Sequence, residues 1–130
     1  MREFIATVTK IDSSEHLNIV TFRFLDYSLT MMSLDLSDIS VGSSVKLSCK
    51  PTSIALAKEF SGDISLSNAL KATITSIDIG KLLCSVKLDV DGVEFESIIT
   101  TSSLNRMRLK EDDSLTIFIK ASELSIKEVL

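Results

Sequence analysis

The sequence has few of the residues that interrupt strands or form large aromatic surfaces. Its 130 residues include one proline, four glycines, one tyrosine and no tryptophan, whereas 45% are hydrophobic. Low proline and glycine combined with this apolar content are typical of a globular chain and argue against a disordered or low-complexity one. We therefore expect a packed, mainly aliphatic core.

The sequence also lacks a concentration of positive charge and a long apolar run. The formal net charge is −4, and the 14 basic residues are scattered along the chain. Proteins that bind DNA without regard to sequence need a positive surface, so direct nucleic-acid binding is not expected. No segment approaches the ~20 apolar residues of a membrane span, and the N-terminus has no signal pattern. These features predict a cytoplasmic protein without a membrane contact.

Residues that commonly perform catalysis or bind metals are sparse. Cys49 and Cys84 each lie in an alternating pattern without a partner at metal-ligand spacing, and His16 stands alone in a polar turn. We interpret the cysteines as buried apolar residues and the histidine as an exposed loop residue. Because no nucleophile with a matched base is visible, we predict a binding protein rather than an enzyme.

Two parts of the chain repeat each other. Residues 29–34 (LTMMSL) align with 99–104 (ITTSSL) and residues 45–56 with 115–126, both displaced by 70 positions, while residues 4–12 align with 70–78 at a displacement of 66. In this alignment Thr30, Ser33 and Lys50 recur as Thr100, Ser103 and Lys120.

Alternation of apolar and polar residues predicts β-strands in both repeats. Asp91-Gly92 is typical of a two-residue hairpin turn, and residues 33–39 and 102–109 are short helical candidates. We predict an all-β fold of two tandem oligonucleotide-binding (OB)-type barrels, each five-stranded with a short helical insert. The first repeat is residues 1–58, the second is residues 65–130, and residues 59–69 connect them. Ile64, Leu66 and Leu70 are expected to hold the connecting segment against the barrels.

A recurring hydroxyl pair and lysine point to a polyoxygenated anion as ligand. Thr100 and Ser103 precede a helical candidate, where uncapped amides also bind oxyanions. The alternative is that Ser33 and Ser103 are only N-caps and that both lysines are surface charges. Phe118 shares the face of Lys120, which predicts that another subunit covers this face.

Several short motifs occur in a recognisable order: Ser65-Leu66-Ser67-Asn68, Leu70-Lys71-Ala72, Ile99 to Ser103, and Lys120-Ala121-Ser122. Their order and spacing resemble those of the Mop, or TOBE, domain of molbindins, in which Ser-Ala-Arg-Asn, Leu-Lys-Gly, Ile-Thr-x-x-Ser and Lys-Ala-Ser follow one another. With the first repeat included, the chain resembles a tandem di-Mop protein, similar to the effector domain of the molybdate-responsive regulator.

The resemblance implies that molybdate or tungstate is bound as an oxyanion at subunit interfaces, for intracellular molybdenum homeostasis, storage or sensing. It implies a homo-oligomer, a trimer in preference to a dimer, and no side chain bound directly to the metal. Carried over by position, the oxyanion-binding residues are Ser65, the amide of Leu66, Ser67, Thr100, Ser103, Lys120 and the amide of Ala121. A possible second site comprises Thr30, Ser33 and Lys50.

Two departures from the family pattern affect these expectations. Ser67 replaces the family arginine, so the site has less positive charge unless Arg106 or Arg108 substitutes for it. Arg2 falls where Asn68 falls in the second repeat, so the first-repeat site is either incomplete or completed by a segment of another repeat. The alternative functions are an OB-type barrel that binds single-stranded nucleic acid, which uses aromatic platforms, and a purely structural interaction module.

Overall fold

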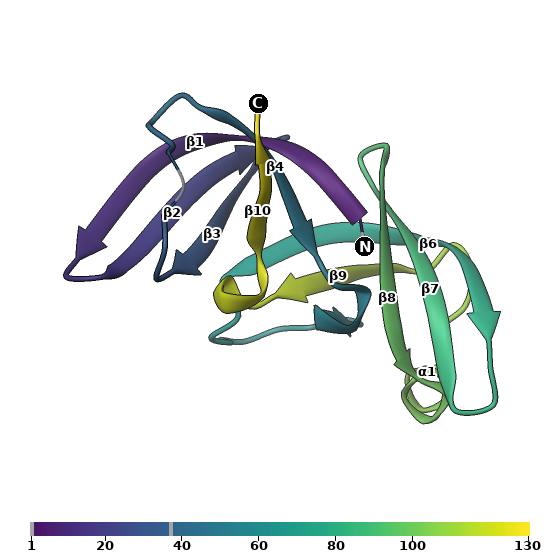
Figure 1. The fold of residues 1–130 in the computed structure, drawn as a ribbon. Coiled ribbons are helices and arrows are strands. Elements are labelled where there is room, and N and C mark those ends of the chain that lie inside the picture. The colour runs from purple at the N-terminus through teal and green to yellow at the C-terminus, as the bar shows by residue number, and fades with distance from the viewer. Residues whose placement is uncertain (1, 37) are drawn as a thin grey trace.

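A computed structural model describes residues 2–36 and 38–130 of the chain, which are mostly β-strand (Figure 1). Within these residues the elements are β1 (Arg2–Ser14), β2 (Leu17–Phe24), β3 (Tyr27–Ser33), β4 (Ser44–Cys49), the 3₁₀ turn η1 (Pro51–Ser53), β5 (Ile54–Ala57), β6 (Asn68–Ile79), β7 (Leu83–Val90), β8 (Val93–Thr100), α1 (Thr101–Met107), β9 (Ser114–Ile119), the 3₁₀ turn η2 (Ala121–Glu123) and β10 (Ser125–Val129).

The strands form two curled antiparallel sheets that exchange a strand. Their orders are β10-β4-β1-β2-β3 and β5-β9-β6-β7-β8, so each sheet takes one outer strand from the other half of the sequence. Figure 1 shows the C-terminal strand β10 beside β4 of the first half. The prediction of a mostly β, OB-like fold is confirmed, and the division into two tandem domains stays a prediction.

The two halves repeat the same strand register. β1, β2 and β3 correspond to β6, β7 and β8 at a displacement of 66, because the hairpin-closing pair Phe24↔Tyr27 corresponds to Val90↔Val93. The alternation of buried and exposed residues matches at the same displacement, with Leu29 and Phe95 both fully buried. β4 and β9 correspond at a displacement of 70. The four additional residues of the second half therefore lie between β8 and β9, where α1 is found.

This register corrects part of the sequence alignment. Lys50 and Lys120 do correspond, since each follows a strand displaced by 70. Thr30, however, corresponds to Glu96 rather than to Thr100, and Ser33 corresponds to Ile99 rather than to Ser103. The alignment placed the four-residue gap too early. A shift by an even number of residues keeps the same side chains facing the core, so the alternation in the sequence does not reveal it.

The helical insert predicted for residues 33–39 is wrong, whereas the one near 102–109 is found as α1. Strand β3 continues through Ser33, whose hydroxyl donates to the carbonyl oxygen of Asp35 at 2.5 Å. Residues 34–36 and 38–40 form no helix, and residue 37 lies outside the described residues. The first half lacks the four residues that form the helix in the second half.

The core is continuous between the halves. The rings of Phe4 and Phe24 from the first half pack against Phe95 from the second, with centroid separations of 5.1 Å and 6.0 Å to Phe95. Cys49 and Cys84 are both buried and free, as predicted. The continuity means that neither half presents a complete core without the other.

Phe118 is covered by the same chain, which corrects the expectation of a subunit contact there. Phe60 of the connecting segment packs edge-on against it at a centroid distance of 5.3 Å. Lys58 anchors the start of this segment by donating to the carbonyl oxygens of Met107 and Arg108, each at 3.3 Å. The segment is therefore held against the sheets, as expected, although Ile64 stays 46% exposed.

Candidate functional site

Lys120 and Ser67 are brought together by the pairing of β6 and β9. Asn68 lies opposite Ile119 in this ladder, so Ser67 and Lys120, one residue beyond each, are neighbours. Both residues are exposed, and Lys120 forms no ion pair with any described residue. Turn η2 begins directly after Lys120, and the amide at the first position of a helical turn has no partner within that turn. The N–H of Ala121 is therefore a second donor beside the lysine.

Asn68 joins this region to the first half of the chain. Its side chain is fully buried and pairs with the peptide groups of Thr30 on β3, the outer strand of its sheet. The Thr30 amide donates to Asn68 Oδ1 at 2.6 Å, and Asn68 Nδ2 donates to the Thr30 carbonyl oxygen at 2.9 Å. Thr30 therefore lies near Ser67 and Lys120 of the second half. We call Ser67, Asn68, Lys120, Ala121 and Thr30 the Lys120 corner.

Ser33 lies farther along β3 and faces turn η2. Together with Ser122 it lines a cleft between β3 and the C-terminal segment, whose other lining residues include Met32, Leu34 and Ser125. The first-half hydroxyls are thus closer to the second-half turn η2 than the sequence repeat implied. Whether a segment of another repeat completes the first-repeat site stays a prediction.

Thr100 and Ser103 form a tight pair at the start of α1. The Ser103 amide donates to Thr100 Oγ1 at 3.1 Å, and the two hydroxyl oxygens are 3.0 Å apart. Thr100 is the N-cap, so the capping interpretation holds for Thr100 rather than for Ser103. Arg106 Nη2 reaches Ser103 Oγ at 3.4 Å, which adds a guanidinium beside the hydroxyl pair.

Within one chain the Thr100–Ser103 pair and Lys120 lie at opposite ends of β6. Asn68, the first residue of this 12-residue strand, lies beside Ile119, and its last residue, Ile79, lies opposite Cys84. Thr100 pairs with Leu83 at that far end. The structure therefore does not bring the seven residues predicted for the second-repeat site together in a single chain.

The first half shows the same separation between its lysine and its hydroxyl pair. Lys50 follows Cys49, which pairs with Arg2 at the start of β1. Thr30 instead lies on the outer strand β3, where it pairs with Thr21 of β2, and β1 and β2 separate β3 from β4. Lys50 is thus not brought beside Thr30 and Ser33. The turn that Lys50 precedes, η1, contacts β8 of the second half.

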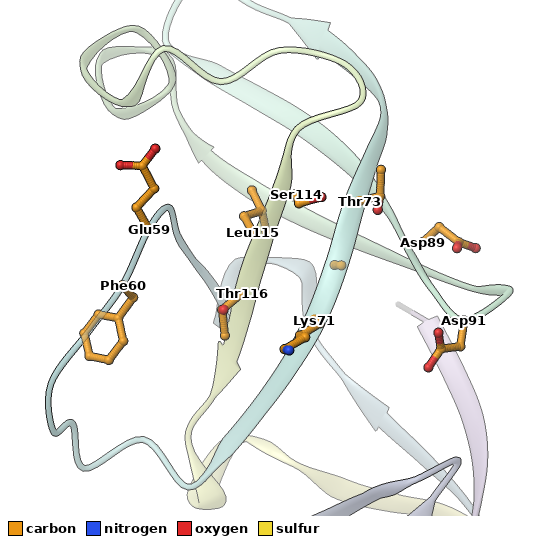
Figure 2. A pocket seen from close by; sticks show the side chains of 10 residues that line it. Glu59, Phe60, Lys71, Thr73, Asp89, Asp91, Ser114, Leu115 and Thr116 are labelled. Carbon is orange, nitrogen blue, oxygen red and sulfur yellow. The ribbon is translucent and has the colours of Figure 1, made fainter.

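A larger cleft lies elsewhere on the outer face of β6 and β9 and has a different character. Figure 2 shows Lys71 between the carboxylates of Glu59 on one side and Asp89 and Asp91 on the other. None of the predicted site residues lines this cleft. Three carboxylates against one lysine disfavour an anionic ligand, so the cleft does not extend the candidate site.

The distribution of aromatic residues bears on the nucleic-acid alternative. Five phenylalanines are buried, and Phe60 is 42% exposed but packed against Phe118. Single-stranded nucleic acid binds where successive bases stack on exposed rings. The described residues offer no such row of rings. They also include no group of three His, Cys, Asp or Glu side chains suited to a metal ion, and no helix among them is long and apolar enough to span a membrane.

Sequence reasoning missed the structural role of Asn68 and the partners of Arg2. The sequence motif alone does not reveal that Asn68 is buried, where its polar side chain needs hydrogen-bond partners. Arg2, its counterpart, forms an ion pair with Glu94 on β8. Asn68 thus contacts β3 of the first half, and Arg2 contacts β8 of the second half.

Comparison with known proteins supports the fold and the family. The TOBE domain family matches residues 64–126. The crystal structure of the cytoplasmic molybdate-binding protein ModG, in a form with molybdate bound, matches with a TM-score of 0.91 and 23% identity over 96% of this chain and 94% of that chain. A molybdate-binding protein from Sporomusa ovata matches with a TM-score of 0.46 and 32% identity over 46% of this chain and 90% of that chain. No curated protein matches the sequence.

The likeness to ModG is one of fold and covers nearly the whole chain, and the TOBE match covers the second half with the Lys120 motif. Residues 64–126 therefore belong to the TOBE domain family, and the chain as a whole shares its fold with ModG.

Proposed function

We propose that the protein binds molybdate or tungstate as an intact tetrahedral oxyanion at the Lys120 corner. The main evidence is Lys120, which is exposed and has no ion-pair partner among the described residues. It lies beside Ser67 at the end of the β6–β9 ladder. The hydroxyls of Ser65 and Ser67 and the amides of Leu66 and Ala121 are the further donors.

The chemistry of this donor set fits a dianion. A tetrahedral oxyanion has four acceptor oxygens and no donor, so it is bound best by hydroxyls, amides and a cation. The nearby carboxylate of Glu123 accepts a hydrogen bond from Ser53 Oγ of the other half at 3.1 Å, so it has its own partner. No bond to the metal atom is required, and none of these residues forms a nucleophile–base pair. The proposed role is therefore binding rather than catalysis.

Thr100 and Ser103 complete the proposed cradle from a second copy of the chain. Their place at the far end of β6 prevents them from reaching Lys120 of their own chain. A homo-oligomer, a trimer in preference to a dimer, would place the hydroxyl pair of one copy against the lysine of the next. The molybdate-bound ModG structure, which shares the fold, supports this ligand class. We infer a cytoplasmic role in molybdenum homeostasis, storage or sensing.

Titration calorimetry with molybdate, tungstate and sulfate tests the proposal. Lys120→Ala should weaken molybdate binding by about 30-fold, because removing one partner of a charge-assisted hydrogen bond costs about 2 kcal/mol. Lys127→Ala is the matched control, since Lys127 is also exposed and lies on β10, away from the corner. Absence of heat with all three oxyanions, or equal losses in both variants, would refute the proposal.

The oligomer is tested separately by light scattering and by mixing variants. A chain that carries Lys120→Ala and a chain that carries Thr100→Ala should each bind weakly alone. If the site is shared between copies, mixed oligomers should regain part of the binding, because some interfaces then pair an intact lysine with an intact threonine. A monomeric protein with full molybdate affinity would contradict the shared site.

A further inference from the structure

The repeated register creates a counterpart of the Lys120 corner in the other half. Arg2 lies opposite Cys49 as Asn68 lies opposite Ile119, and Lys50 follows Cys49 as Lys120 follows Ile119. We call Arg2, Lys50, Pro51 and Glu94 the Lys50 corner. The two corners are equivalent in backbone arrangement, so their difference in side chains indicates what each one binds.

The Lys50 corner lacks the amide donor of its counterpart. Pro51 is the first residue of η1, where Ala121 is the first residue of η2. Proline has no backbone N–H, so it offers no hydrogen bond to an oxyanion. The backbone before both turns is equally extended, with φ and ψ of −73° and 142° at Lys50 and −68° and 142° at Lys120. The donor is therefore absent because residue 51 is proline, and the backbone conformation at the two turns is the same.

The strand that faces the Lys50 corner carries carboxylates. At the place of Thr30 on β3, strand β8 has Glu96, and two residues earlier it has Glu94 in place of Ser28. The Glu94 carboxylate forms an ion pair with Arg2, whereas the half-buried Glu96 carboxylate accepts a hydrogen bond from Ser85 and lines a separate cleft with Ser76 and Lys87. The Glu94 carboxylate neutralises Arg2 and repels a dianion, whereas Lys50 itself is exposed and forms no ion pair with any described residue.

We infer that the Lys50 corner is an ion-pair contact between the two halves and not an anion site, so that the chain takes up no more than one oxyanion, at the Lys120 corner. This inference rests on the proposed function. It also assigns Arg2 a partner within the protein: the guanidinium is committed to Glu94 and does not replace the arginine that Ser67 lacks. The duplicated fold thus retains two matching corners, only one of which has the donors for a ligand.

The stoichiometry of molybdate binding to the full chain tests this inference. Calorimetry or equilibrium dialysis should give at most one molybdate per chain. Lys50→Ala should leave both the stoichiometry and the affinity unchanged within twofold, whereas Lys120→Ala should weaken binding by about 30-fold. A stoichiometry near two per chain, or a loss of sites in Lys50→Ala, would overturn the inference. If the wild-type protein binds no molybdate, the proposed function fails, whereas a stoichiometry near two overturns only this inference.

Arg2→Ala and Glu94→Ala provide a second measurement. Both variants, and the double variant, should retain molybdate affinity within twofold, and their shifts in urea midpoint should not be additive because both remove the same ion pair. A loss of affinity of tenfold or more in Arg2→Ala alone would show that this guanidinium serves a bound anion, contrary to the inference.

Discussion

Replacing Asn68 with leucine should destabilise the protein far more than an ordinary exposed polar-to-apolar change. The Asn68 side chain is fully buried and makes two hydrogen bonds to the peptide groups of Thr30 on the other sheet. Leucine has a similar size, so packing changes little, but it leaves a donor and an acceptor of Thr30 unpaired. With a cost of roughly 1–3 kcal/mol for each buried group left unsatisfied, we expect a loss of about 3 kcal/mol in the free energy of unfolding.

Urea denaturation of the ligand-free protein, followed by far-ultraviolet circular dichroism, measures this loss as a shift in the transition midpoint at constant m-value. Arg2→Leu is the matched control, since Arg2 is the pseudo-equivalent residue. Its ion pair with Glu94 joins side chains that are 40% and 47% exposed, so the expected loss is below about 1 kcal/mol. Equal shifts for the two variants, or a loss below about 1 kcal/mol for Asn68→Leu, would refute the view that Asn68 joins the halves.

Four further predictions concern stability and reactivity. Ser97→Ala should cost about 1–2 kcal/mol in urea unfolding, because the buried Ser97 hydroxyl donates to the Ile54 carbonyl oxygen at 2.6 Å. Burial raises the pKa of the Cys49 thiol from 9.0 to about 11, so native Cys49 should react slowly with iodoacetamide at pH 8. Because this pKa is higher in the folded state, its contribution to stability is complete below pH 9 and should be lost as the pH rises towards 11. Gly80→Ala should lower the thermal midpoint, because its added Cβ would lie 2.5 Å from the Leu83 carbonyl oxygen.

Each of these predictions has a result that would contradict it. Ser102→Ala, at an exposed position beside the helix cap, is the control for Ser97→Ala and should be nearly neutral. Alkylation of native Cys49 as fast as in urea would contradict its burial. An unchanged thermal midpoint in Gly80→Ala would mean that the β6–β7 turn rearranges without cost.

The alternation of residue types carried most of the local information. It predicted the strands, the buried cysteines and the Asp91-Gly92 turn, where φ values of 47° and 92° now confirm the left-handed conformation that favours glycine. These features depend on neighbours within a few positions, and period-two patterning expresses such neighbours directly.

The sequence by itself thus determined a β-rich fold and two related halves, and it supplied the candidate residues of the proposed anion site. Only the tertiary structure decided which of these candidate residues lie close together. It exchanged β5 and β10 between the sheets, placed Thr30 against Asn68, and separated Thr100 from Lys120. Strand exchange and register depend on contacts between residues far apart in the chain, and a slip of four residues preserves every inward-facing position. Alternation alone therefore cannot predict the strand exchange and register that position the candidate site.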